Sequence, residues 1–350
     1  MTTAWSMFFP PGTRVLALPS WRNPRCYLPM ERPLKRWRYS SLYPAYSLKG
    51  RLYRLSLRLG AVAGMAEVRT ARSSGWPLAE FVEDVLPRLT SAVVLVGTPG
   101  PAQHITAQLH DEKGRVLGYL KYAEKDAARK RLRQERFMLS NLPDGIGPKP
   151  LKFGPLGDGA ALLKEALPGK LLTATLPSPE DVFDLLDSLP SLPPVPLEDH
   201  PWVRLMRDPG VPQLDAWFEP LAGRSWPITP QHGDFAPWNL LRLSDGRLMA
   251  IDWEYGELES FPYLDLAHYI LQVSALIYQR PPLEAAQYTT SYLSQRPGLG
   301  LNRAEAQALT RLAAYDAYRK SSEDGQPIVA AGIRLQAWRR AIWEDGVYVA

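Results

Sequence analysis

The hydrophobic and polar positions of the chain change their period near residue 91. The run SAVVLVG at residues 91–97 is almost wholly apolar, as in a buried strand, whereas HITAQLHD at 104–111 alternates apolar and polar residues. The polar turn DEKGR then leads into VLGYLKYA at residues 116–123, which has the pattern of a third strand. Connections this short join neighbouring antiparallel strands, so the pattern predicts a three-stranded antiparallel meander.

The next stretch, KDAARKRLRQERFMLSNL at residues 125–142, has helical periodicity. Its apolar face runs through Ala128, Leu132, Leu139 and Leu142. Glu135 falls on that same face, where a buried carboxylate is costly unless it is paired. Two interpretations stay open: Glu135 points inward to a lysine of the sheet, or the face is tilted or frayed and Arg131 or Arg136 is a surface partner.

A second amphipathic pattern lies near the start of the chain. Leucines recur at helical spacing between basic residues: Leu48, Leu52, Leu55 and Leu59 alternate with Lys49, Arg51, Arg54 and Arg58. Such a helix can lie on a membrane surface, although a stripe of this kind more often packs on its own protein, and Gly50 weakens the helix. Residues 1–72 hold 13 Lys and Arg against two acids, and the rest holds 28 bases against 34 acids. This basic arm indicates either an anionic partner or a basic surface that packs on the acidic rest of the same chain.

Composition sets the broad class. At 350 residues, with 45% hydrophobic and 22% charged residues, the chain is typical of a globular protein of two lobes. The single cysteine, Cys26, excludes an intramolecular disulfide and a cysteine-based zinc site. No uncharged apolar run reaches the length of a membrane span, and the first residues lack the order of a signal peptide. We therefore expect a cytoplasmic protein.

The candidate chemistry lies in two short motifs of the second half. HGDFAPWN at residues 232–239 places Asp234 and Asn239 five positions apart, the interval of the kinase catalytic loop. The segment RLSDGRL predicts a hairpin turn at Asp245 and Gly246, and the apolar run LMAI then leads to Asp252 in IDWE. Loop, hairpin and strand end should bring Asp234, Asn239 and Asp252 together, and oxygen ligands of this kind suit Mg²⁺.

Together with PYLDLA at residues 262–267, these motifs resemble the catalytic signature of the aminoglycoside phosphotransferase and choline kinase family. The resemblance implies an α+β, bilobal protein-kinase-like fold, with a small antiparallel-sheet N-lobe and a mostly helical C-lobe. On this basis residues 1–90 form an extra basic N-terminal extension, 91–168 the N-lobe, and 169–350 the C-lobe with the catalytic loop and acceptor-binding helices.

The resemblance also implies roles for the motif residues. Asp234 resembles the catalytic aspartate that orients the acceptor hydroxyl, and Asn239 and Asp252 resemble the metal ligands. His232 and Asp265 resemble the residues that support the catalytic loop. From the residues alone, these two also fit a hydrogen-bonded core histidine and a carboxylate at a helix N-terminus.

Upstream, the resemblance places the nucleotide near Lys121, Glu135, Gly97, Gly100, Glu165 and Leu167. Lys121 resembles the strand lysine that contacts the phosphates, with Glu135 as its partner. The segment from Lys164 to Leu167 resembles the hinge that binds adenine through its backbone. The loop VGTPGPAQHI has two glycines but lacks the stricter G-x-G-x-x-G pattern, a departure that leaves open how tightly it holds the nucleotide.

The predicted activity is ATP- and Mg²⁺-dependent transfer of a phosphoryl group to a hydroxyl of a small-molecule or glycan acceptor, such as a cell-envelope sugar. The alternative is a pseudokinase that uses the fold and basic arm for binding. An anionic membrane surface is a candidate partner for residues 1–72, which would place the protein at the inner face of the membrane. Nucleic acid is not expected, because only charge supports it. Several acids could bind a cationic acceptor or form a solvated face: Glu254, Glu257, Glu259, Glu323 and Asp324.

Overall fold

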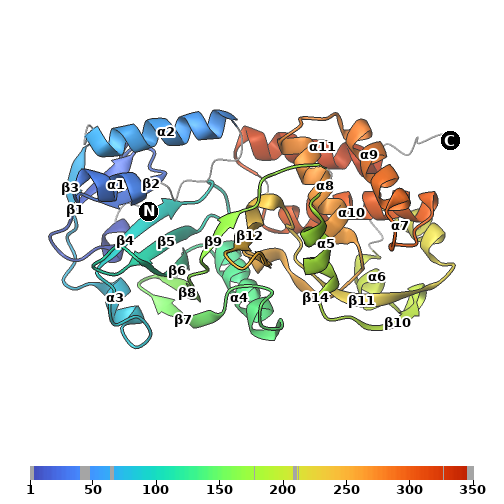
Figure 1. Cartoon of the computed structure of the whole chain (residues 1–350), viewed down its shortest axis with the longest axis horizontal. Coiled ribbons are helices and arrows are strands. Elements are labelled where there is room, and N and C mark those ends of the chain that lie inside the picture. Colours follow the sequence, from blue (N-terminus) through green and yellow to red (C-terminus); the bar gives the residue numbers. More distant parts are fainter. Residues whose placement is uncertain are drawn as a thin grey trace. The chain divides into compact units, whose positions relative to one another are not determined.

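The structure is a computed structural model in which the described residues are 4–39, 48–63, 67–176, 178–207, 211, 213–325 and 327–344. The chain divides into two compact units, which we describe separately (Figure 1). Unit 1 comprises Met1–Arg136 and Pro148–Leu167, and unit 2 comprises Phe137–Gly147 and Pro168–Ala350.

Unit 1 is built on an antiparallel sheet. Within its described residues eight strands pair in the order β3-β1-β2-β4-β5-β6-β8-β7. Their bounds are β1 Arg14–Leu18, β2 Cys26–Pro29, β3 Val68–Thr70, β4 Ser91–Val96, β5 Ile105–His110, β6 Val116–Ala123, β7 Pro150–Leu156 and β8 Gly159–Glu165. The meander predicted over residues 91–123 is confirmed as β4, β5 and β6. Residues of the predicted N-terminal extension, 1–90, contribute β1, β2 and β3 to this same sheet.

Both faces of this sheet are covered. The helices near it are η1 Ala4–Phe8, α1 Pro33–Tyr39, α2 Leu48–Ala63, α3 Pro77–Val82 and α4 Asp126–Asn141. Alternate residues of β1 enter different clusters: Val15 packs with the buried residues of α3, whereas Leu16 packs with those of α2. The predicted apolar face of α4 is also present, because Ala128 and Leu132 are fully buried against β6 and β8.

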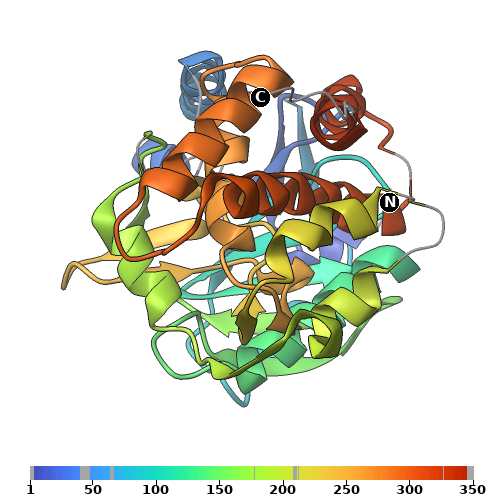
Figure 2. The same ribbon diagram turned by 90° about the vertical axis from the view of Figure 1, so that its right-hand side faces the viewer.

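Unit 2 is mostly helical (Figure 2), and the buried apolar residues of its described part form one cluster. Its helices are α5 Glu180–Asp187, α6 Pro201–Met206, α7 Leu214–Phe218, α8 Leu264–Leu276, α9 Pro282–Gln295, α10 Arg303–Glu323 and α11 Ala330–Glu344. Its strands are β9 Gly169–Leu171, β10 Leu192–Pro196, β11 Ser225–Gln231, β12 Leu240–Leu243, β13 Leu248–Ala250 and β14 Glu257–Ser260. They form two sheets, β10-β11-β14 and β13-β12-β9.

The hairpin predicted for unit 2 is confirmed. The segment RLSDGRL forms the β12–β13 hairpin, and Gly246 in its turn has a φ of 90°, a conformation that glycine adopts without penalty. The stretch from residue 264 onward is helical wherever it forms regular structure, and Trp343 is buried in the core. Within the described ranges no helix has the length and hydropathy needed to cross a bilayer.

Candidate active site

The catalytic-loop motif connects β11 to the short helical turn η5 (Pro237–Asn239) and is braced by a carboxylate from α8. Asp265, in the first turn of α8, accepts hydrogen bonds from the backbone N–H of His232 at 2.6 Å and of Gly233 at 3.0 Å. Burial raises the pKa of the Asp265 carboxyl above its ordinary value, although His232 and the two N–H groups favour the charged form. Asp265 therefore ties the backbone of this loop to the first turn of α8.

His232 links this loop to the end of β13. Its Nε2 lies 2.7 Å from the Ile251 carbonyl oxygen, and its Nδ1 accepts the backbone N–H of Asp234 at 3.2 Å. The two contacts fit the tautomer with the proton on Nε2. Gly233 has a φ of +79°, and a Cβ there would lie 2.3 Å from the carbonyl oxygen of Tyr255. Only glycine fits this position without displacing backbone.

The three predicted polar residues converge around the hairpin. Asn239 donates through Nδ2 to the Oδ2 of Asp234 at 3.0 Å and to its carbonyl oxygen at 2.8 Å. The N–H of Ile251 donates to the carbonyl oxygen of Asn239 at 2.8 Å, so Asp252 follows directly beside the start of β12. Asp252 has a φ of 64° in the left-handed region, which is uncommon outside glycine and often marks functional residues.

This donor set suits a hard divalent cation. The amide nitrogen of Asn239 is directed at Asp234, so its carbonyl oxygen would be the ligand atom, and Asp252 would supply carboxylate oxygens. Mg²⁺ takes few protein oxygens and completes its shell with water and phosphate. In the described part of the chain, no group of three or more His, Cys, Asp or Glu side chains could hold a metal.

A histidine that the sequence analysis did not single out lies beside Asp234. The Nε2 of His268, on α8, is 3.3 Å from the Oδ1 of Asp234, and its side chain is buried. Burial alone would raise the pKa of Asp234, but the hydrogen bond and charge of His268 lower it more, with smaller contributions from His232 and Arg339. The sequence does hold a signal for this contact, because His268 lies three residues after Asp265 and therefore on the same face of the helix.

The strand that precedes the loop ends in a buried polar network. Gln231 donates to Asp316 at 3.0 Å and accepts from Lys320 at 3.0 Å, both on α10. Burial alone would raise the pKa of Asp316, but the charges of Lys320 and Arg319 outweigh this effect, so the pKa lies below its ordinary value. The same network engages acids that were candidates for a cationic acceptor: Glu257 and Glu323 each form an ion pair with Arg319. These two carboxylates are therefore tied to the protein's own cations.

Unit 1 contains a buried triad of charged side chains. The ion pair predicted between Lys121 on β6 and Glu135 on α4 is present at 2.8 Å, with 2% and 0% of the two side chains exposed. Lys164 on β8 is buried too and pairs with the other carboxylate oxygen of Glu135. The sequence analysis assigned no role to the Lys164 side chain. The three groups together carry one net positive charge, which suits a phosphate ligand.

The remaining nucleotide-site candidates lie in loops and at strand ends of unit 1. Gly97 starts the β4–β5 hairpin loop, and a Cβ there would lie 2.7 Å from the carbonyl oxygen of His104, whereas Gly100 has open space around it. Glu165, at the end of β8, accepts the backbone N–H of Lys149 at 2.7 Å. Leu167 is the last residue of unit 1, where a hinge segment is expected. The close approach at Gly97 is thus a requirement of the hairpin itself.

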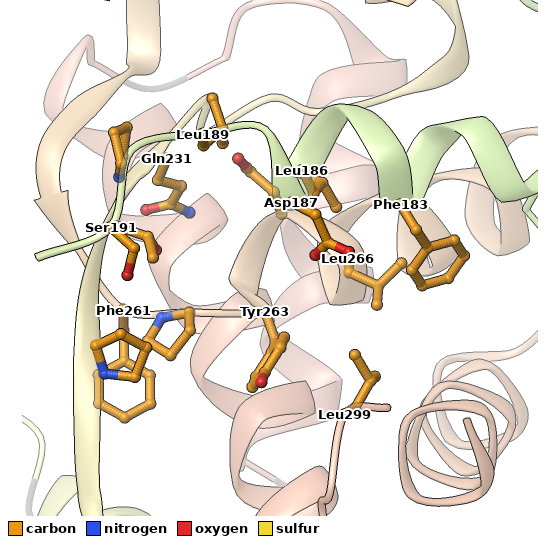
Figure 3. A pocket seen from close by; sticks show the side chains of 15 residues that line it. Phe183, Leu186, Asp187, Leu189, Ser191, Gln231, Phe261, Tyr263, Leu266 and Leu299 are labelled. Atoms are coloured by element: carbon orange, nitrogen blue, oxygen red, sulfur yellow. The ribbon is translucent and has the colours of Figure 1, made fainter. Parts of the chain in front are cut away.

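A small cavity of about 210 Å³ lies in unit 2 beside the loop brace. Its wall includes Asp265 and Gln231, together with Asp187 at the end of α5, Tyr263 just before α8, and Leu299 (Figure 3). Asp234, Asn239 and Asp252 are not among its lining residues. The volume is below the usual range of ligand pockets, about 300–1,000 Å³, so we attribute no ligand to it.

The chain has structural similarity to small-molecule kinases, although no family model and no curated protein matches its sequence. A thermostable mutant of aminoglycoside phosphotransferase APH(4)-Ia is 17% identical with a TM-score of 0.46, covering 77% of this chain and 99% of that one. Ethanolamine kinase from Plasmodium vivax is 14% identical with a TM-score of 0.49, covering 75% and 85%. A putative fructosamine-3-kinase from Haemophilus somnus is 11% identical with a TM-score of 0.43, covering 76% and 96%.

These proteins fall in the family that the motifs resemble, and a second APH(4)-Ia structure is a ternary complex with ADP and hygromycin B. Unit 1 carries an antiparallel sheet with a buried Lys–Glu pair, and unit 2 is largely helical and carries the braced loop. This is an α+β, kinase-like set of elements.

Proposed function

We propose that the chain is an ATP- and Mg²⁺-dependent phosphotransferase that moves the γ-phosphate to a hydroxyl of a small-molecule or glycan acceptor. One observation carries the proposal: Asn239 holds the carboxylate of Asp234 on a loop braced by Asp265, and the β12–β13 hairpin places Asp252 beside it. A polar turn with only a structural role does not need a catalytic-type carboxylate, an amide and a second carboxylate held together in this way.

In the proposed reaction Asp234 accepts a hydrogen bond from the acceptor hydroxyl and orients its oxygen toward the γ-phosphorus. The new O–P bond forms as the bond from the γ-phosphorus to the bridging oxygen of ADP breaks, and the hydroxyl proton passes to Asp234. The low pKa of Asp234 makes it a weak base, which fits proton transfer late in a loose transition state. Asn239 and Asp252 would hold Mg²⁺, which when bound neutralises charge on the phosphates.

We assign the nucleotide phosphates to Lys121. Its ammonium group is kept in one position by Glu135, which is itself held by Lys164, so the cation is positioned before the ligand arrives. The glycine loop at Gly97 and Gly100 and the segment from Glu165 to Leu167 are proposed to contact the phosphates and the adenine. These assignments follow the order of motifs in the resemblance.

The proposed class of acceptor is based on the hydroxyl that Asp234 would orient, and not on the shape of a pocket. We propose a hydroxylated small molecule or glycan, with a cell-envelope sugar as the first class to test. The excess of basic residues over residues 1–72 supports an anionic partner and a place at the inner face of a membrane. The alternative function is a pseudokinase that binds partners without transferring phosphate.

Nucleotide-dependent stabilisation separates these two functions. ATP with Mg²⁺ should raise the Tm, since a ligand at roughly 100 times its Kd adds about 2.7 kcal/mol to stability. The shift should vanish without Mg²⁺ and in Asp252→Ala. Asp245→Ala is the matched control, because Asp245 is a carboxylate in the turn of the same hairpin that accepts hydrogen bonds from Arg247. The absence of any shift, together with ATP hydrolysis that Asp234→Asn leaves unchanged, would exclude the enzyme.

A further inference from the structure

Helix α2 buries a narrow face and leaves three of its leucines largely exposed. Leu57 and Ala61 are 5% and 0% exposed and pack with Leu16 of β1. By contrast, Leu52, Leu55 and Leu59 are 60%, 45% and 56% exposed. Leu57 is two residues from both Leu55 and Leu59, which is about 200° around the helix. The leucine stripe therefore points away from the sheet, contrary to the more common arrangement in which such a stripe packs on its own protein.

The flank of this stripe is basic. Arg51 is exposed, Arg54 is half-buried, and the α2 sequence from residue 48 to 63 contains no acidic residue. Arg58 is tied to α1, because its guanidinium lies 4.0 Å from the centre of the Trp37 ring and donates to the Trp37 carbonyl oxygen. On α1 itself Leu34 is 82% exposed. An apolar stripe flanked by cations is typical of helices that lie in the plane of a membrane interface.

We infer that α2 docks on an anionic membrane surface, with Leu52, Leu55 and Leu59 in the acyl boundary and Arg51 and Arg54 among the headgroups. Charge complementarity selects this occupant. If two copies met through the stripe, arginine flanks without acidic partners would be brought close together, which is unfavourable. The inference refines the anionic-partner proposal made above for residues 1–72, and it does not require the phosphotransfer chemistry.

Vesicle co-sedimentation of the full-length chain tests this inference. The protein should bind vesicles of pure phosphatidylglycerol and should not bind matched vesicles of pure phosphatidylcholine. The triple variant Leu52→Ser, Leu55→Ser and Leu59→Ser should bind on the order of a hundredfold more weakly, because each leucine has about half of its surface left to bury. Arg51→Glu and Arg54→Glu should each weaken binding at least roughly fivefold, and raising the salt concentration should weaken it further.

The matched control is a triple serine variant at leucines of unit 2 with comparable exposure, Leu192, Leu205 and Leu283, and it should bind like the unmodified chain. Circular dichroism should show that both triple variants fold. Asp234→Asn should retain vesicle binding, so failure of the proposed enzyme activity and failure of this inference give different results. Equal binding of the α2 triple variant would overturn the inference. So would a dimer that this variant abolishes while vesicle binding persists.

Discussion

Removing the charge of Glu135 should destabilise the protein strongly. Glu135→Gln keeps the size of the side chain but leaves the ammonium groups of Lys121 and Lys164 without their shared carboxylate, where 2% and 6% of the lysine side chains are exposed. Breaking a buried ion pair on one side costs about 3–5 kcal/mol, because the remaining charge stays buried and uncompensated. For a domain of this size, each kcal/mol lowers the Tm by about 2–4 °C, so the expected loss is roughly 6–20 °C.

The assay is thermal unfolding followed by circular dichroism, with denaturant unfolding to obtain the free energy. The matched control is Asp84→Asn, which removes the partner of Lys152 from an ion pair whose side chains are 59% and 31% exposed. An exposed pair of this kind contributes about 1 kcal/mol or less. Lys164→Met should also cost less than Glu135→Gln, since it leaves the neutral pair with Lys121 intact. If Glu135→Gln lost no more stability than Asp84→Asn, the triad would not be the buried charge centre described here.

Three further predictions concern the catalytic loop and the core. His268→Leu should raise the pKa of Asp234, so the acid limb of the pH–rate profile should move to higher pH. His268→Gln, which keeps a donor, should move it less, and an unshifted limb would contradict the contact. Because the pKa of Asp234 is lower in the folded than in the unfolded protein, its ionised form stabilises the fold above the unfolded pKa, and this stabilisation is lost as pH falls through the folded pKa. The loss of stability should be smaller in His268→Leu. Gly246→Ala should lower the free energy of unfolding by about 1 kcal/mol, since only its φ is unfavourable for alanine. Gly233→Ala also brings a Cβ onto the backbone of Tyr255 and should cost about 3 kcal/mol or more. Equal losses in denaturant unfolding would argue against the close approach at Gly233. Burial raises the pKa of the Cys26 thiol to about 12, so a thiol reagent should label it only after unfolding, and rapid labelling of the native protein would show that the site is open.

Some of the fold could be predicted because the signals are local. The strands of the meander alternate or run apolar over a few residues, and the turn at Gly246 follows from two turn-forming residues. The need of Glu135 for a partner was also accessible, because a carboxylate on an otherwise apolar helix face is costly unless paired; that the partner is Lys121 was implied by the family resemblance. In each case a single segment contains the information.

Other features depend on contacts between distant segments. Lys164 reaches Glu135 only because β8 pairs with β6 in a register that places Lys164 opposite Tyr119, and the pattern of either strand alone does not set that register. The period of α2 predicted a helix, but not which of its faces meets the sheet. The buried face contains Leu57 and Ala61, which pack against Leu16 and Leu28. Packing therefore buried these two residues and left the leucine stripe exposed.

The candidate catalytic residues were predicted from spacing and resemblance, whereas the contact between His268 and Asp234 was not predicted. Asp234, Asn239 and Asp252 stand at intervals that a loop and a hairpin bring together. The approach of His268 to Asp234 depends on how α8 is placed by the Asp265 brace, which is a tertiary contact. The roles of these residues in phosphotransfer stay predictions until activity is measured.

The central claim is that Asp234 supports transfer of a phosphoryl group to an acceptor hydroxyl, and an acceptor screen for ADP release tests it most directly. Aminoglycosides, amino alcohols such as choline, and sugars of the cell envelope would each be supplied with ATP and Mg²⁺, with Asp234→Asn as the blank. We expect at least one hydroxylated acceptor to raise ADP release by the unmodified chain and to leave Asp234→Asn at its background rate. Acceptor-dependent ADP release that is equal in the two proteins would contradict the account.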